Sequence, residues 1–149
     1  MINLYRMRML MRQVPRKLWQ IEQEQAKATK VTAVLTGMPR GGSGRNQVED
    51  GAIKLAELKE AYSAVTNELH QMQEELIPLI NTLEDARLSA TMRLRYINGY
   101  SEIEIADSIY VADRTVRRYL LMAERELCNR YPDKVAKDTM KAVLDCPKT

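Results

Sequence analysis

Apolar residues recur three and four positions apart through the middle of the chain, from Leu55 to Leu83. This stripe consists of Leu55, Leu58, Tyr62, Val65, Leu69, Met72, Leu76, Leu79 and Leu83. Four heptads of this spacing predict a long helix that starts near Val48 and packs through an apolar seam, as in a coiled coil. Pro78 lacks the amide hydrogen that a helix needs, so it is expected to bend or interrupt this helix near its end and to serve as a hinge.

A second, partly polar stripe earlier in the chain predicts a partner for that helix. It comprises Leu18, Ile21, Gln25, Ala28, Thr32 and Leu35, and it ends at Gly37, a suitable C-terminal cap. Pro15 fits the first turn of this helix, and the spacing of Leu4, Met7, Met11 and Val14 indicates a short extra helix before it. Because an isolated amphipathic helix is marginal in water, we expect a helical hairpin that also pairs with a second copy of the chain.

Charge supports a contact between these two regions. Residues 1–48 hold nine basic and two acidic groups, a net charge of +7, whereas residues 49–85 hold two basic and nine acidic groups, a net charge of −7. Helices of opposite charge attract each other, so the two blocks favour an internal or dimer contact.

Two short helical patterns separated by a brief break occupy Ser101 to Leu121, SEIEIADSIYVADRTVRRYLL. Ser101 followed by Glu104 forms a capping box that marks a helix start, and the small Ala106 lets two helices cross closely. The small core between the helices is predicted to contain Ile105, Ile109, Val111, Val116 and Tyr119. A helix over 86–98 precedes this pair, and Pro132 ends the second helix near Tyr131. The pattern therefore predicts a helix-turn-helix.

The second helix of such a motif enters the major groove of DNA and carries the residues that contact bases. Here the predicted base-facing residues are Asp113, Arg114, Arg117, Arg118 and Leu121. Arginine is suited to this task because its guanidinium binds O6 and N7 of guanine together. Phosphate contacts are predicted for the flanking arginines Arg87, Arg93, Arg95 and Arg125. The alternative is a helical hairpin whose arginines form a solvated face.

The segment RLRYINGYSEIEIADSIYVADRTVRRYLLMAEREL (93–127) resembles the promoter-contacting region 4 of sigma factors. The whole layout, with the loop TGMPRGGSGRNQVED (36–50), resembles small Gram-positive phage transcription regulators of the RinA/ArpU late-gene type. This resemblance implies promoter binding and regulation of phage genes. Two positions depart from the pattern. Tyr110 stands where the turn commonly has a glycine with positive φ, and Ala112 stands at the usual Ser/Thr cap, which Asp113 could replace.

The loop from Met38 to Asn46 contains PRGGSGR. It lacks the GK[ST] ending of a phosphate-binding loop, so nucleotide binding is weakly supported. Arg40 and Arg45 could reach a minor groove as a flexible arm, although a plain linker between helices is the better-supported interpretation.

Composition narrows the remaining function classes. The chain has no Phe, one Trp, six Gly and nine Met, which favours helices over sheets. His70 is the only histidine, and Cys128 and Cys146 lack metal-ligand spacing, so we expect no enzyme, no cofactor and no metal site. His70 is expected at the surface and Cys128 in the core. No apolar run approaches a membrane span, so the cytoplasm is the expected location, and the resemblance to phage regulators implies the cytoplasm of a bacterial host cell.

Together these patterns predict an all-α protein. The expected parts are a helical hairpin or coiled coil over residues 1–84, a helix-turn-helix domain over 85–131 and a C-terminal tail over 132–149. The expected function is a sequence-specific transcription regulator that binds double-stranded DNA, with RNA polymerase as a further candidate partner and a dimer as the expected state. A small terminase-like DNA-packaging subunit and a coiled-coil adaptor that binds no DNA are the alternatives.

Overall fold

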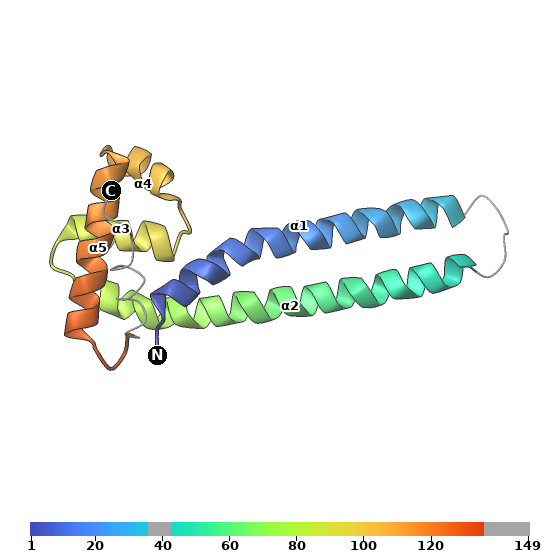
Figure 1. The fold of residues 1–149 in the computed structure, drawn as a ribbon, viewed down its shortest axis with the longest axis horizontal. Helices are drawn as coiled ribbons and strands as arrows, with labels where there is room; N and C mark the ends of the chain where they lie inside the picture. The colour runs from blue at the N-terminus through green and yellow to red at the C-terminus, as the bar shows by residue number, and fades with distance from the viewer. Residues whose placement is uncertain (36–42, 136–149) are drawn as a thin grey trace. The chain divides into compact units, whose positions relative to one another are not determined.

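The computed structural model describes the backbone of residues 1–35 and 43–135, and the side chains of 1–29 and 49–135. These residues form five helices in the order α1 (Leu4–Leu35), α2 (Ser43–Ile80), α3 (Ala86–Tyr96), α4 (Glu102–Ile109) and α5 (Asp113–Arg130) (Figure 1). The only pairing of β type in this part of the chain is an isolated bridge between Ile2 and Val135. The predicted all-α class is confirmed.

The chain divides into two compact units. One consists of Met1–Met11 and Leu69–Thr149, and we call its described part, residues 1–11 and 69–135, the α3–α5 unit. The other, Arg12–Glu68, is called the hairpin unit. The α3–α5 unit thus includes residues 1–11 and 69–84, which the sequence pattern grouped with the hairpin over 1–84.

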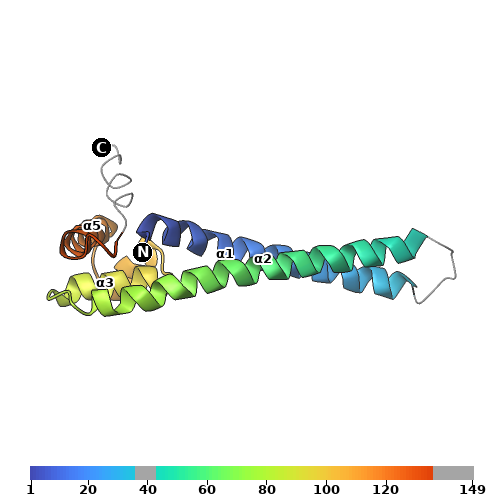
Figure 2. The same ribbon diagram turned by 90° about the horizontal axis from the view of Figure 1, so that it is seen from below.

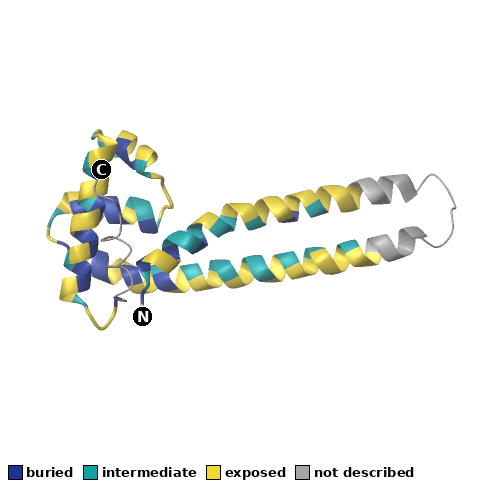
Figure 3. Ribbon diagram, viewed as in Figure 1, coloured by how far each residue is buried: buried dark blue, intermediate teal, exposed yellow. Residues whose placement is uncertain are grey.

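The hairpin unit has the predicted helical pair, with a partly covered seam. Glu24 of α1 accepts from Lys54 of α2 at 3.1 Å, so the two helices run beside each other here. Ile21 is buried, whereas the seam residues of α2 in this unit are only half-buried: Leu55, Leu58, Tyr62 and Val65. Figure 3 shows this intermediate burial along the helices of the hairpin. Two helices alone therefore cover only part of the apolar stripe.

Helix α1 begins earlier than the sequence predicted. Pro15 does not start a helix but lies inside the continuous α1, so the predicted short extra helix is wrong. A proline inside a helix costs about 3 kcal/mol. The apolar positions nevertheless keep one period across it, since Met7 and Leu10 before it and Ile21 after it are all buried.

Helix α2 also extends beyond its predicted start. It begins at Ser43, not near Val48, so the end of the predicted loop, residues 43–46, is helical. The rest of that loop, including Arg40, lies outside the described residues, as does the side chain of Arg45. At the other end α2 continues through Pro78 to Ile80. The proline therefore lies two residues from the end of the helix and does not interrupt it.

The α3–α5 unit has a dense apolar core. Helices α3 and α5 pack against each other, and α4 packs on α5 (Figure 1, Figure 2). Fully buried side chains come from every part of the unit: Ile2, Leu4, Met7, Leu10, Leu76, Ile80, Met92, Tyr96, Ile105, Val116 and Leu127. Residues 1–11 thus contribute four fully buried side chains to the unit that contains α5, which lies about a hundred positions later in the chain.

Candidate nucleic-acid interface

Helix α4 begins at the predicted capping box. The amide of Glu104 donates to Oγ of Ser101 at 3.3 Å, and the amide of Ser101 donates to Oε2 of Glu104 at 2.7 Å. The Ser101 amide, and then its hydroxyl, hold the pKa of the Glu104 carboxyl below its ordinary value of 4.5. Two backbone donors that a helix start would leave unpaired are thereby satisfied, which fixes where α4 begins.

A three-residue turn, Tyr110 to Ala112, joins α4 to α5. Tyr110 adopts φ 57° and ψ 45°, the left-handed conformation that the turn was expected to require. Ala112 is the N-cap of α5 and makes no side-chain cap hydrogen bond. Asp113 is the first helical residue and so does not take over as the cap, contrary to the alternative that the sequence left open. Ile105 and Val116 are fully buried between the helices, while Ile109, Val111 and Tyr119 are half-buried.

Replacement of Tyr110 by glycine is expected to stabilise the protein by about 1 kcal/mol, because a left-handed conformation strains any residue with a Cβ atom. The ring is 94% exposed, so its loss removes little packing. Thermal denaturation followed by circular dichroism measures the change. Tyr110→Ala is the matched control, since it removes the ring and keeps the Cβ. Equal stabilisation by both variants would assign the effect to the ring and not to the backbone.

The structure places the predicted base-facing residues on the outer side of α5. Asp113, Arg114, Arg117 and Arg118 are exposed, and Leu121 is 37% exposed. Arg114, Arg117, Arg118 and Leu121 follow one another at intervals of three, one and three, so they share one face of the helix. The guanidinium of Arg118 also lies 6.0 Å from the centre of the Tyr119 ring. We call Arg114, Arg117, Arg118 and Leu121 the α5 outer face.

The flanking arginines have more varied surroundings. Arg87 lies 3.4 Å from Asp85 and 5.8 Å from the Tyr119 ring, and Asp85, followed by Tyr119, raises the pKa of Arg87. Arg93 donates to the side chain of Asn81, and Arg95 donates to the backbone carbonyl of Tyr100 at 3.1 Å. Arg93 and Arg95 therefore hold loop segments beside α3. Arg125 is exposed on α5.

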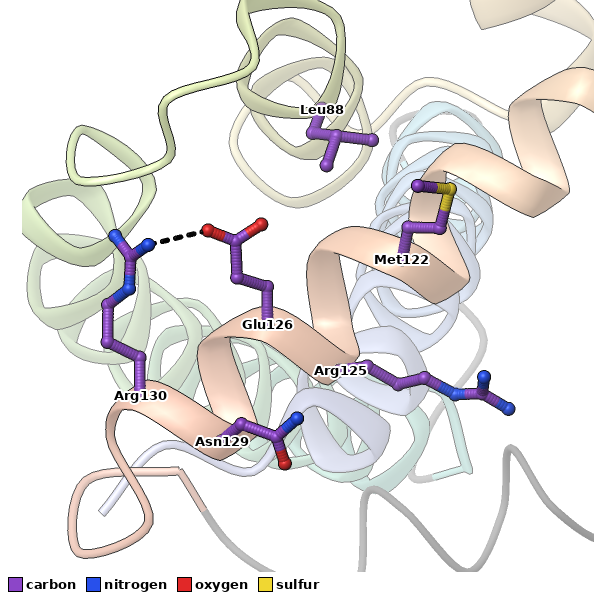
Figure 4. Close-up of a pocket in the computed structure, with 6 residues that line it drawn as sticks. All are labelled: Leu88, Met122, Arg125, Glu126, Asn129 and Arg130. Atoms are coloured by element: carbon purple, nitrogen blue, oxygen red, sulfur yellow. Dashed lines mark hydrogen bonds and ion pairs between the residues drawn. The ribbon is translucent and has the colours of Figure 1, made fainter.

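A shallow groove of about 570 Å³ lies between α3 and α5 (Figure 4). Its lining residues are Leu88, Met122, Arg125, Glu126, Asn129 and Arg130. Arg130 bonds Glu126 at 2.7 Å and the carbonyl oxygen of Thr82 at 2.6 Å, so its charge is already paired. In Figure 4 the side chain of Arg125 extends away from this pair. The groove thus brings together no second free cation beside Arg125, and it adds no phosphate site to the α5 outer face.

A buried polar cluster on the core side of α5 was not predicted from the sequence. The hydroxyl of Tyr96 donates to Oε1 of Glu124 at 2.5 Å, and Arg8 lies 4.0 Å from the same oxygen. Gln73 donates to the carbonyl of Tyr96 at 2.9 Å. Glu124 is only 4% exposed, and burial is the main cause that raises its pKa. A signal was present, because Glu124 stands among Leu120, Ala123 and Leu127 on the apolar side of α5.

Glu124 is expected to make the stability of this unit depend on pH. Its folded-state pKa lies above the ordinary 4.5, so the folded protein keeps a proton that the unfolded chain has already lost. The free energy of unfolding should therefore fall as pH rises from about 4.5 through the raised pKa. Urea denaturation over this range should show the slope in the wild type and a smaller slope in Glu124→Gln. An unchanged slope in the variant would assign the dependence to another group.

The remaining expectations concern a metal site, the two cysteines, His70 and a membrane span. No group of His, Cys, Asp or Glu in the described residues is arranged to hold a metal ion. Cys128 is buried, as predicted, and Cys146 lies outside the described residues. His70 is exposed, as predicted, and its Nε2 lies 3.2 Å from Glu74. Within the same described part, no helix combines the length and apolar character needed to cross a membrane.

Comparison with known proteins gives a family but no characterised relative. No curated protein and no solved structure matches the chain. A family model described as a protein of unknown function (DUF1492) matches residues 28–128, a range that includes α3, α4 and most of α5 but not residues 1–27. Because this match covers well over half of the chain, the protein belongs to the DUF1492 family.

Proposed function

We propose that this protein is a sequence-specific DNA-binding regulator of transcription, and that α4 and α5 act as a helix-turn-helix. The observation that carries the proposal is the α5 outer face, where three arginines project from a helix whose opposite side is buried. In this proposal α5 lies in the major groove, and Arg114, Arg117 and Arg118 contact base edges. Arginine forms paired hydrogen bonds with guanine that discriminate by about 1–3 kcal/mol.

The surroundings of α5 support a rigid mode of docking. The capping box fixes the start of α4, and the buried Tyr96–Glu124 contact ties α5 to α3. A recognition helix whose inner side is fixed by buried contacts loses little conformational freedom when it binds DNA. In the proposal Arg87 and Arg125 contact phosphates on either side of α5, and such contacts set the register of a protein on DNA.

A dimer is part of the proposal. The half-buried seam of the hairpin unit favours helix pairing between two copies, and the opposite charges of residues 1–48 and 49–85 are compatible with such a contact as well as with the pairing of α1 and α2 within one chain. Two-fold proteins bind half-sites about one helical turn apart. The resemblance to RinA/ArpU-type regulators extends the proposal to phage promoters, with RNA polymerase as a partner and the bacterial cytoplasm as the location.

A binding titration against a pool of promoter-sized DNA fragments at two salt concentrations tests the proposal. Selective binding that persists at moderate salt is the expected result. Weak, unselective binding with steep salt dependence, together with a ring-sized oligomer, would instead indicate a small terminase-like packaging subunit. Absence of binding at both salt concentrations would overturn the proposal and leave a coiled-coil adaptor.

A further inference from the structure

A carboxylate at the start of α4 holds an arginine of the α5 outer face. Glu102 is the first residue of α4, and its Oε2 accepts a hydrogen bond from Nε of Arg117 at 2.6 Å. The two residues stand 15 positions apart, so the bond crosses from one helix to the other. The side chains are 67% exposed for Arg117 and 33% exposed for Glu102, which places the pair at the solvent boundary.

The bond to Glu102 uses only one edge of the Arg117 guanidinium. Glu102 engages the Nε edge, whereas the two terminal nitrogens form a separate edge at the tip of the side chain. That tip is one of the edges that can bind O6 and N7 of guanine together. An exposed ion pair adds little to stability, so the main effect of Glu102 is to restrict where the Arg117 side chain points. Restricting a flexible side chain before binding lowers the entropy lost on contact with a base.

The charge of Glu102 acts in the same direction. A carboxylate beside the α5 outer face repels phosphates, and phosphate attraction supplies most of the affinity for DNA of unrelated sequence. Glu102 should therefore weaken non-specific binding while it favours the oriented contact of Arg117 with a base. Both effects increase the ratio of specific to non-specific affinity.

We propose that Glu102 is a positioning residue that sets sequence discrimination at the DNA interface by orienting Arg117 toward a guanine. This inference rests on the proposed DNA-binding function and goes further by naming the residue that prepares a base contact. The DNA that it favours carries a guanine opposite Arg117.

The test compares Glu102→Gln with the wild type on two duplexes. One is the duplex that the wild type selects from a random-sequence pool, and the other is a scrambled duplex of the same length and composition. Glu102→Gln is expected to lower the ratio of the two affinities about threefold, with tighter binding to the scrambled duplex. Asp107→Asn is the matched control, because Asp107 is an exposed carboxylate on the same helix. It removes the same charge, so its effect on the ratio measures the charge alone, and this effect should be smaller than that of Glu102→Gln.

A double-mutant cycle separates positioning from a general loosening of α4. In an Arg117→Ala background, Glu102→Gln should lower the ratio by less than in the wild type, because the group that it orients is absent and only the repulsion of phosphates remains to be lost. Circular dichroism melting of each variant shows whether α4 stays folded. A fall in the ratio of equal size in both backgrounds would overturn the positioning role.

The remaining outcomes keep the two proposals apart. If the wild type selects a sequence but Glu102→Gln changes both affinities by the same factor, the inference about Glu102 is wrong and DNA binding stands. If the wild type enriches no sequence, the proposed function fails, and with it the role of Glu102.

Discussion

Leu4→Ala is expected to lower the free energy of unfolding of the α3–α5 unit by about 2–5 kcal/mol, although Leu4 lies more than a hundred positions before α5 in sequence. The side chain of Leu4 is fully buried, as are those of Ile2, Met7 and Leu10. Removal of one methine and two methyl carbons from such a site leaves a cavity whose surroundings relax only partly. Because a domain of this kind is stable by only about 5–15 kcal/mol, the loss is a large fraction of the total.

Amide hydrogen exchange in α3 and α5 measures the loss of stability caused by Leu4→Ala in the α3–α5 unit itself. The single tryptophan, Trp19, lies in the hairpin unit, so its fluorescence does not report on these helices. Tyr5→Ala is the matched control, since Tyr5 is the next residue of α1 and is 49% exposed. It should change exchange in α3 and α5 by about 0.5 kcal/mol or less. Equal effects of the two variants would show that residues 1–11 do not form part of this core.

Residues 1–11 lie outside the region of the chain that the family model matches. The match to DUF1492 begins at residue 28, so these residues lie outside it, yet they carry four of the fully buried side chains of the α3–α5 unit. Ile2 also donates its amide to the carbonyl of Lys134 at 2.7 Å, which joins this segment to the residues just after α5. The matched region therefore does not contain the whole core of this unit, and a fragment limited to it would lack these four buried side chains.

Local features of the chain were predictable from the sequence. The Ser101–Glu104 capping box and the end of α5 at Arg130, before Pro132, both depend on residues within one or two turns of each other. The seam of α2 from Leu55 to Leu79 was predictable for the same reason, because its spacing alone defines one helix face, whereas Leu83, the last residue of the predicted stripe, lies beyond the end of α2 at Ile80. Short-range rules of capping and periodicity suffice for features of this kind.

Long-range features were not predictable by these rules. Nothing near Leu4 indicates that it packs in the unit that contains α5, and nothing near Glu102 indicates a bond to Arg117. At Pro15 the local rule gave a wrong prediction. Local chemistry favours a helix start there, whereas the structure continues α1 through it in register with buried residues on both sides. The burial of Leu4 and the Glu102–Arg117 bond both depend on residues distant in sequence.

Arg117→Ala is expected to relax the sequence preference of DNA binding and to weaken binding to the selected duplex by about 1–3 kcal/mol. Arg117 lies in the middle of the α5 outer face, between Arg114 and Leu121, and Glu102 holds its guanidinium. A contact to a base edge is lost only on the sequence that offers that base, so the scrambled duplex should be affected much less. Selection of new sequences by the variant, followed by titration, measures the change in preference at each position.

Arg125→Ala is the informative comparison, because Arg125 is also an exposed arginine of α5 but lies two turns further along the helix. As a phosphate contact it should weaken binding to both duplexes alike and reduce the slope of log affinity against log salt by about one. If Arg117→Ala behaves in this way instead, Arg117 contacts phosphate. If it has no effect on either duplex, α5 does not present this face to DNA. The two arginines together thus test the orientation of the helix and not only its affinity.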